Sequence, residues 1–208
     1  MSSREDRPVL TELKLIRKSD AIDGIWGNEE SGFVPTLFYL LSNELMVLTL
    51  TIPPGGAFRA YGEYRAYFDS HLCLYVLAGQ YTYLNPETGE VRTAQQGEML
   101  FLPEKLWHYG NNFGDSDLRV IEIFSPPADA SALADVPIPE TTKLCDPGAL
   151  EGLQEQTIQG TNNPRLRNEN NAVEALIEGS PYIWTHVYAS TERVFLAVTK
   201  MLPGQYSG

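Results

Sequence analysis

Residues 97–112, GEMLFLPEKLWHYGNN, constrain the fold more strongly than any other part of this chain. The run at 99–102 is wholly apolar, which is typical of a strand that is buried on both faces. Pro103 ends that strand, because proline cannot donate to a strand ladder. His108 then follows on the next strand. This order predicts an imidazole in the interior of a β-barrel.

Short apolar runs separated by turn residues extend this pattern along the chain. Val, Ile, Leu, Phe and Tyr dominate the runs at 44–52, 75–84 and 118–124, and aromatic residues make up 11% of the sequence. These residue types have high strand propensity. Asn85 and Gly89 are typical of a turn that leads into a further strand. Short, evenly spaced strands predict an all-β sandwich or jelly-roll barrel with a few short helices.

The positions of Gly97, Pro103, His108 and Asn112 resemble the second sequence motif of the cupin superfamily. That motif runs Gly, five residues, Pro, one residue, Gly, two residues, His, three residues, Asn. Lys105 stands where the family has its second glycine, and this is the one departure. The resemblance implies a cupin-type double-stranded β-helix, in which the motif histidine, here His108, is a metal ligand.

An outline of the first cupin motif lies upstream, in residues 55–79. In the family this motif supplies two histidines and a glutamate. Their places fall here on Tyr61, Glu63 and Leu72, and eight residues separate the last two where the family has three or four. The usual ligand set therefore cannot be carried over, and only His108 matches its motif position.

Replacement ligands can be proposed for a metal inside such a barrel. Glu63, His71 and His108 would form a two-histidine, one-carboxylate set, which suits non-haem Fe(II) with open positions for substrate and oxygen. Manganese, nickel and zinc are alternatives, as is a barrel without metal. Side chains alternate across a strand, so an inward Leu72 places His71 outward unless a bulge shifts the register. For Glu63 the alternative is a solvated carboxylate at a loop rim.

Charge and hydropathy exclude several classes of partner. The net charge is −12 and the pI is about 4.6, which disfavours nucleic acid and anionic membranes. No apolar run reaches the ~20 residues of a membrane span, and the N-terminus is too polar for a secretory signal. We therefore expect a cytoplasmic protein. Cys73 lies in an apolar run and is expected to be buried as a free thiol.

Composition divides the chain into four segments. They are an N-terminal arm at 1–32, a barrel at 33–126, a Pro- and Ala-rich linker at 127–170 and a group of strands at 171–208. Within the linker, Asp146 as a cap and Pro147 in the first turn predict one short helix.

The last segment resembles the start of the barrel. Both pass from aromatic residues through a polar turn into a strand, and Pro203-Gly204 follows Pro54-Gly55 by 149 positions. This weak repeat indicates either the start of a second barrel, as in a two-barrel cupin (bicupin) of which the chain is a fragment, or strands that pack on the barrel or extend a partner's sheet. Since an unpaired apolar strand invites aggregation, we expect a homodimer or larger homo-oligomer.

Three functions fit these observations. The preferred hypothesis is a metal-dependent, oxygenase-like enzyme that acts on a small organic substrate, with nearby aromatic residues favouring an aromatic or cyclic one. The second is a metal-free isomerase, epimerase or lyase, in which His108 is the general base and Tyr61 or Glu63 the acid. The third is a non-catalytic ligand-binding module or the degenerate half of a bicupin.

Overall fold

The computed structural model describes residues 13–28, 32–58, 68–85, 88–128, 165–176, 183–201 and 203–204. Strands dominate these ranges, and their helical content is one 3-10 turn, η2 (Lys18–Asp20). The predicted all-β fold is thereby confirmed. The helix predicted after Asp146 lies outside the described residues, as do Tyr61 and Glu63. No helix in the described ranges is long and apolar enough to cross a membrane.

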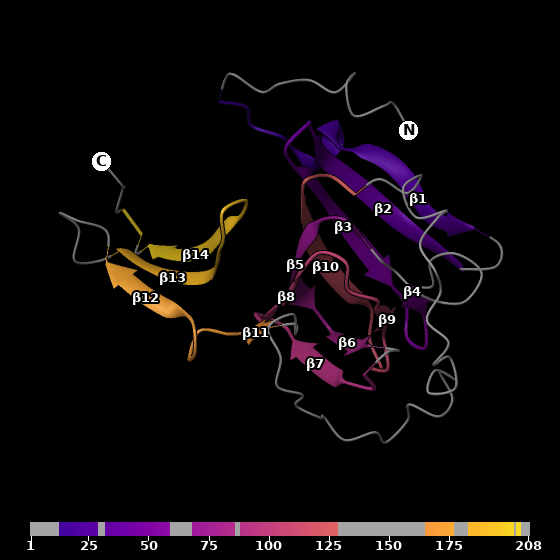
Figure 1. The fold of residues 1–208 in the computed structure, drawn as a ribbon. Coiled ribbons are helices and arrows are strands. Elements are labelled where there is room, and N and C mark those ends of the chain that lie inside the picture. The colour runs from indigo at the N-terminus through magenta and orange to yellow at the C-terminus, as the bar shows by residue number, and fades with distance from the viewer. Residues whose placement is uncertain are drawn as a thin grey trace.

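The strands form three antiparallel sheets (Figure 1). The strand bounds are β1 (Ile22–Asn28), β2 (Gly32–Leu41), β3 (Met46–Ile52), β4 (Ala57–Phe58), β5 (His71–Ala78), β6 (Gln80–Leu84), β7 (Val91–Gln95), β8 (Met99–Leu102), β9 (Tyr109–Asn111), β10 (Leu118–Ser125), β11 (Arg165–Arg167), β12 (Val173–Leu176), β13 (Ile183–Ser190) and β14 (Phe195–Met201). The sheet orders are β1-β2-β3-β10-β5-β8-β11, β4-β9-β6-β7 and β12-β13-β14. The first two sheets enclose the barrel, and the third stands beside it.

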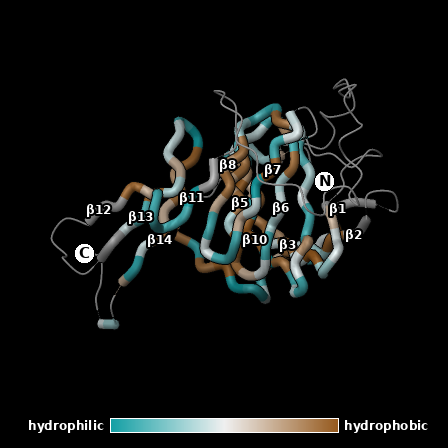
Figure 2. The backbone as a smooth tube through the Cα atoms, turned by 90° about the horizontal axis from the view of Figure 1, so that it is seen from below, coloured by the Kyte–Doolittle hydropathy of each residue, from teal (hydrophilic) through white to brown (hydrophobic). Residues whose placement is uncertain are grey.

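The barrel core lies between the seven-stranded and four-stranded sheets. Alternate residues of β3 are buried, as expected for a strand with one face on a core. Figure 2 shows apolar residues concentrated on β3, β5, β8 and β10. The largest fully buried core side chains include Met46, Leu48, Ile52, Leu72, Leu74, Tyr83, Leu100, Leu102, Leu118 and Phe124.

All four residues of β8 are buried because this strand is covered on both sides. Leu100 and Leu102 belong to the barrel core. Met99 and Phe101 belong to a second cluster, in which the outer face of the large sheet packs against β13 and β14. The burial predicted for residues 99–102 is confirmed, and the third sheet is what covers the outer side.

Tyr188 of β13 anchors the third sheet on the barrel. Its ring packs edge-on against Tyr75 with a centroid separation of 6.0 Å, and its hydroxyl donates to the Gly97 carbonyl at 3.3 Å. Cys73 lies in the same cluster as a fully buried free thiol, as predicted. Burial raises the pKa of this thiol from 9.0 to about 12, so it stays protonated and acts as an apolar side chain.

Lys105, the one departure from the second motif, has a left-handed backbone with φ of 60°. Glycine adopts this conformation without steric cost, which is a physical reason for a glycine at this place in the motif. The Lys105 N–H donates to the Phe68 carbonyl at 2.8 Å. The chain therefore keeps the motif's turn with a residue that is strained in it.

The hairpin of β13 and β14 repeats the register of the hairpin of β2 and β3. Thr36 pairs with Leu50 in the first hairpin, and Thr185 pairs with Thr199, each 149 positions later, in the second. The register shift that interrupts each ladder also recurs at the same offset, at Phe38/Leu40 and at Val187/Ala189. β12 pairs with β13 on the side where β1 pairs with β2.

The two hairpin turns also share their hydrogen bonds. The Ser42 N–H donates to the Leu45 carbonyl at 2.9 Å, and the Thr191 N–H donates to the Val194 carbonyl at 2.8 Å. In each turn the hydroxyl of the first residue accepts from the N–H three residues later, at 3.0 and 2.9 Å. The sequence repeat thus corresponds to a repeat of backbone geometry.

Candidate functional site in the barrel interior

His108 lies just before β9 and is 4% exposed. Its Nδ1 is 3.1 Å from the Leu106 carbonyl oxygen. Because a carbonyl can only accept, this contact assigns the ring proton to Nδ1 and leaves the Nε2 lone pair available. The imidazole stacks on Tyr83, with centroids 6.2 Å apart and planes 24° from parallel, and has Phe68 at 5.8 Å. The predicted placement of this histidine inside the barrel is therefore observed.

Burial keeps the His108 imidazole neutral. It lowers the pKa from 6.5 to about 4, against the opposing effect of the hydrogen bond to Leu106. At neutral pH the side chain thus has a basic nitrogen at Nε2, and its Nδ1 proton is held in the hydrogen bond to the Leu106 carbonyl oxygen.

Glu122 on β10 is a second interior group, which sequence reasoning missed. Its neighbours along the same face, Val120 and Phe124, belong to the barrel core, so alternation places Glu122 inward. Its cross-strand partners, Leu48 and Leu74, are core residues as well. The side chain is half-buried.

The surroundings of the Glu122 carboxyl favour its protonated form. Burial raises its pKa from 4.5 to about 8, and within the described residues no hydrogen bond or ion pair offsets that cost. A neutral carboxyl is a proton donor, whereas an ionised one only accepts. The interior therefore combines an acid in its protonated form with a base in its neutral form.

Tyr81 and Tyr83 of β6 are buried tyrosines of the barrel core. Burial, and then the nearby Glu122 and Tyr83, raise the pKa of Tyr81 well above 10, so its phenol remains a donor. A Cβ at Gly110 would lie 2.6 Å from the Tyr81 hydroxyl oxygen, so only glycine fits over this ring. Tyr83 thus lies against His108, and Glu122 is near enough to Tyr81 to affect its pKa.

His71 lies on the opposite face of the large sheet from His108. Its ring packs edge-on against Phe101 of the outer cluster, with centroids 5.3 Å apart, and its Nδ1 is 3.4 Å from the Thr191 hydroxyl. The neighbouring Leu72 is inward and 2% exposed. The bulge that would have turned His71 inward is absent from the ladders at this end of β5. The structure therefore does not bring the predicted ligands His71 and His108 together.

The resemblance implies a metal ion in the barrel interior, which needs several donor side chains around one point. Within the described ranges no group of three His, Cys, Asp or Glu side chains is placed to hold an ion. His108 and Glu122 are described donors on the inner side of the barrel, while Tyr61 and Glu63 lie outside those ranges. The described donors do not complete a metal site.

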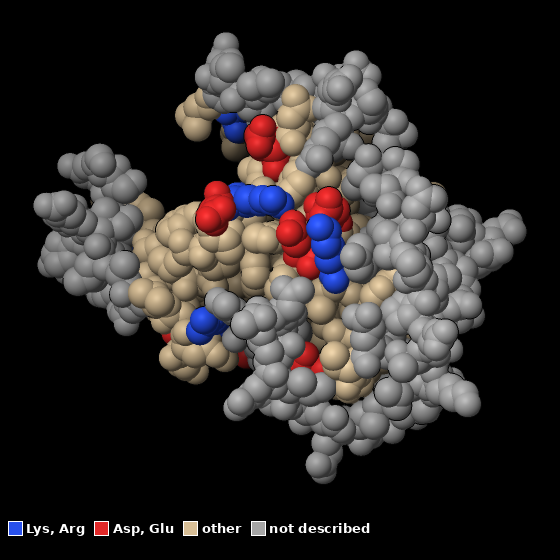
Figure 3. All heavy atoms as spheres, viewed as in Figure 1, with Lys and Arg blue, Asp and Glu red and all other residues tan. Residues whose placement is uncertain are grey.

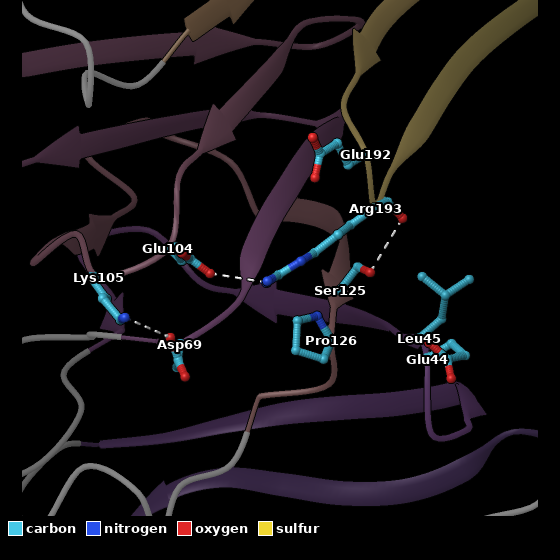
Figure 4. Close-up of a pocket in the computed structure, with 9 residues that line it drawn as sticks. All are labelled: Glu44, Leu45, Asp69, Glu104, Lys105, Ser125, Pro126, Glu192 and Arg193. Atoms are coloured by element: carbon cyan, nitrogen blue, oxygen red, sulfur yellow. Dashed lines mark hydrogen bonds and ion pairs between the residues drawn. The ribbon is translucent and has the colours of Figure 1, made fainter.

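A cleft of about 650 Å³ lies outside the barrel, where the two equivalent hairpin turns approach each other (Figure 4). Its lining includes Glu44 and Leu45 from one turn and Arg193 from the other. Most of the charged residues in this cleft are paired. The shorter of its two ion pairs joins Arg193 to Glu104 at 3.0 Å. Figure 3 shows acidic and basic side chains next to each other on this face. The charged residues of this cleft therefore largely compensate one another.

Solved structures resemble this chain in fold at low sequence identity. A putative glyoxylate-induced protein from Pseudomonas aeruginosa is 12% identical with a TM-score of 0.52, over 81% of this chain and 53% of that one. The polyketide cyclase RemF from Streptomyces resistomycificus is 14% identical with a TM-score of 0.48, over 56% and 82%. An RmlC-like cupin from Shewanella frigidimarina is 17% identical with a TM-score of 0.40, over 50% and 85%. No family model and no curated relative matches the sequence.

Proposed function

This chain has the cupin fold, and we propose that its barrel is a metal-independent enzyme that moves a proton on a small carbonyl compound. The observation that carries the proposal is that His108 is buried in the barrel and that Glu122 lies on the core-facing side of β10, where burial lowers the pKa of the imidazole and raises that of the carboxyl. Enzymes that form enols commonly use such a pair, with the acid at the oxygen and the base at the carbon. Cupin-fold neighbours include enzymes, which is consistent with a catalytic role.

The chemistry follows from the two protonation states. The Nε2 lone pair of His108 removes a proton from the carbon beside the carbonyl, and the C–H electrons form a carbon–carbon double bond. The carbonyl oxygen takes the proton of Glu122, giving an enol, an imidazolium and a carboxylate. Transfer of the imidazolium proton to a conjugated carbon on the same face, with return of the enol proton to the Glu122 carboxylate, gives the isomerised carbonyl compound and restores both groups.

The interior surface favours an aromatic or cyclic substrate. Phe68 and Tyr83 flank the imidazole with their rings, and the rest of the wall is the apolar barrel core. Aromatic walls offer large flat apolar contact to a ring of similar shape.

The described residues favour this mechanism over the metal-dependent oxygenase that the motif alone suggested. A two-histidine, one-carboxylate site needs three ligands around one point. His71 lies on the far face of the sheet, so His108 and Glu122 are the described donors left for that role. The oxygenase and acid–base hypotheses differ in one simple property, which is sensitivity to chelation.

Proton exchange in D2O tests the proposal directly. Cyclic and aromatic ketones would be incubated with chelator-treated protein at pH 6.5, and loss of the α-proton signal would be followed by NMR. We expect catalysed exchange that falls by ~10²–10⁴ in His108→Gln, the usual contribution of a general base. Glu122→Gln should also slow exchange, while Glu44→Gln, which removes an exposed carboxylate at a hairpin turn, should not.

Two results would contradict the proposal. Exchange that requires added iron or manganese would instead favour the metal enzyme. Absence of exchange across the panel, with ligands still bound by the wild type, would favour a non-catalytic binding module.

A further inference from the structure

A cavity of about 200 Å³ lies where the third sheet meets the barrel. Phe101 of β8 and Arg167 of β11 line its barrel side, and Figure 1 shows β11 at this junction. From the third sheet, its lining includes Val173, Val187, Tyr188 and Ala189. Because both parts contribute walls, the cavity exists only while the third sheet is docked on the barrel.

The walls of this cavity are mostly apolar. Phe101 and Tyr188 are buried members of the outer cluster, and Ala189 packs against that cluster. Val173 pairs with Val187 across two strands and is 68% exposed. An apolar group that enters the cavity would cover part of this exposed surface, which favours binding.

Arg167 is the residue that carries a charge among the described lining residues. It lies opposite Met99 in the ladder of β11 and β8, and Met99 belongs to the outer cluster, so both side chains are on the face towards the third sheet. Its Nη1 donates to the Asn171 carbonyl oxygen at 3.0 Å. It forms no ion pair with any residue in the described ranges, although the chain has a net charge of −12. Since a guanidinium has five N–H donors, most of them are available to a ligand.

We propose that this cavity binds a short-chain aliphatic carboxylate, with its carboxylate on Arg167 and its alkyl chain between Phe101 and Val187. A guanidinium matches a carboxylate in geometry and forms two parallel hydrogen bonds with it. The described lining has no Asp or Glu, so the ammonium group of an amino acid would find no opposite charge. The cavity is smaller than the ~300–1,000 Å³ of drug-sized sites, which limits the alkyl chain to a few carbons.

This ligand links the third sheet to the barrel. It contacts Phe101 and Arg167 on one side and Val187 on the other, so it binds only the docked arrangement. A ligand that binds one arrangement stabilises that arrangement by mass action. Bound carboxylate should therefore slow hydrogen exchange in β13 and β14.

Titration of the full chain with butanoate and hexanoate, followed by amide NMR, tests the proposal. We expect saturable shifts at Phe101 and at residues 187–189. Arg167→Gln should raise the dissociation constant at least about tenfold, as for loss of a hydrogen bond to a charged group. Arg193→Gln is the matched control and should change nothing, because Arg193 lines the other cleft and pairs with Glu104. Butanol and hexanol, which lack the charge, should bind at least about tenfold more weakly than the acids.

Two variants at Val173 test the charge of the site without altering Arg167. Val173→Glu places a carboxylate at the cavity, where it competes for the guanidinium and repels the ligand, so butanoate should bind more weakly. Val173→Lys changes the same exposed position and should bind butanoate at least as tightly as the wild type. Circular dichroism would check that both variants are folded.

Four outcomes would overturn the proposal. They are the absence of saturable shifts with either acid, shifts confined to β6 and β9 in the barrel, equal dissociation constants for the wild type and Arg167→Gln, and exchange in β13 and β14 that saturating hexanoate leaves unchanged.

Discussion

The two equivalent hairpins, β2–β3 and β13–β14, have the same backbone and opposite surroundings. Their ladders share register, register shift and turn hydrogen bonds. Yet β3 has four buried residues in alternation, while β14 has none fully buried. The first hairpin lies in a closed barrel and the second in an open three-stranded sheet.

This contrast separates local from long-range determinants of the fold. Turn chemistry and strand pairing set the register in both hairpins, since neither depends on what the strand faces. Closing the barrel depends on long-range pairing, and among the described strands β3 pairs with β10 while β14 pairs only with β13. The two surroundings also differ in their effect on ionisable groups. A closed interior shifts the pKa values of His108 and Glu122, and an open sheet has no such interior.

The largest expected effect comes from exchanging residues between the hairpins. Leu48 and Ala197 occupy equivalent positions, and Leu48 is 1% exposed. Leu48→Ala should lower the free energy of unfolding by ~2–5 kcal/mol through lost burial and a residual cavity. Ala197→Leu should change it by less than about 0.5 kcal/mol, as for other changes outside a core. Urea denaturation of both variants measures the difference. Equal effects would mean that the second sheet is as tightly packed as the barrel.

Glu122→Gln should remove a pH dependence of stability that is specific to the barrel. The folded pKa of about 8 exceeds the ordinary 4.5, so the folded carboxyl holds its proton after the unfolded one has released it. Its contribution is full below pH 4.5 and is lost as the pH rises to 8. Relative to Glu122→Gln, the wild type should therefore lose roughly 2–4 kcal/mol over this window, with solvent access allowed for. Urea titrations at pH 5 and 8, with Glu44→Gln as control, measure this; a parallel pH response in both variants would place Glu122 in water.

His108 should produce a loss of stability at acidic pH, opposite in direction to the loss that Glu122 produces as the pH rises. Its folded pKa of about 4 lies below the ordinary 6.5, so its contribution is present above pH 6.5 and is lost as the pH falls towards 4. The wild type should lose roughly 2–3 kcal/mol of stability relative to His108→Gln across that window.

For the proposed enzyme, the same two groups predict a bell-shaped rate profile with limbs near pH 4 and pH 8. A profile that stays flat between these limbs and beyond them would show that neither group takes part in the reaction.

Removing one turn hydroxyl from each hairpin should have a smaller effect on stability. It should show whether the two hairpins unfold together. Ser42→Ala and Thr191→Ala each remove a hydroxyl that accepts from the N–H three residues later. Each loss should cost about 1 kcal/mol. We expect Ser42→Ala to lower global stability, because its hairpin belongs to the barrel, and Thr191→Ala to speed hydrogen exchange in β13 and β14 only. A lower global transition in both variants would indicate that the two hairpins unfold as one unit.

Much of the fold was predictable because short-range patterns encode it. The apolar run before Pro103 and the motif spacing placed His108 in the barrel, and the 149-residue offset matched the repeat in backbone register. The alternation of side chains along a strand predicted an outward His71 in the absence of a bulge, and the ladder has no bulge near it. These inferences need only alternation and turn chemistry, which act within a few residues.

Glu122 was not predictable with the same ease. The strand LRVIEIFS carries apolar residues on both faces because both are partly covered, so no polar face marks the outside. From such a sequence one would predict that the glutamate faces solvent. The positions of Val120 and Phe124 in the core show that it points inward. The interior site depends on which sheets close over β10, and that is a long-range property.

The smallest effect should come from Lys105, in the loop that ties the barrel motif to Phe68. Its φ of 60° costs a side-chain-bearing residue ~1–2 kcal/mol, and glycine avoids this cost but loses more backbone entropy on folding. The exposed ion pair of Lys105 with Asp69 at 3.5 Å contributes little that would be lost. Lys105→Gly should therefore raise the free energy of unfolding by about 0.5 kcal/mol, whereas Lys105→Ala, which keeps the strain, should not. Because the loop belongs to the closed barrel, hydrogen exchange in β13 and β14 should not change in either variant. A gain with alanine equal to that with glycine would trace the effect to the lysine side chain and not to the backbone.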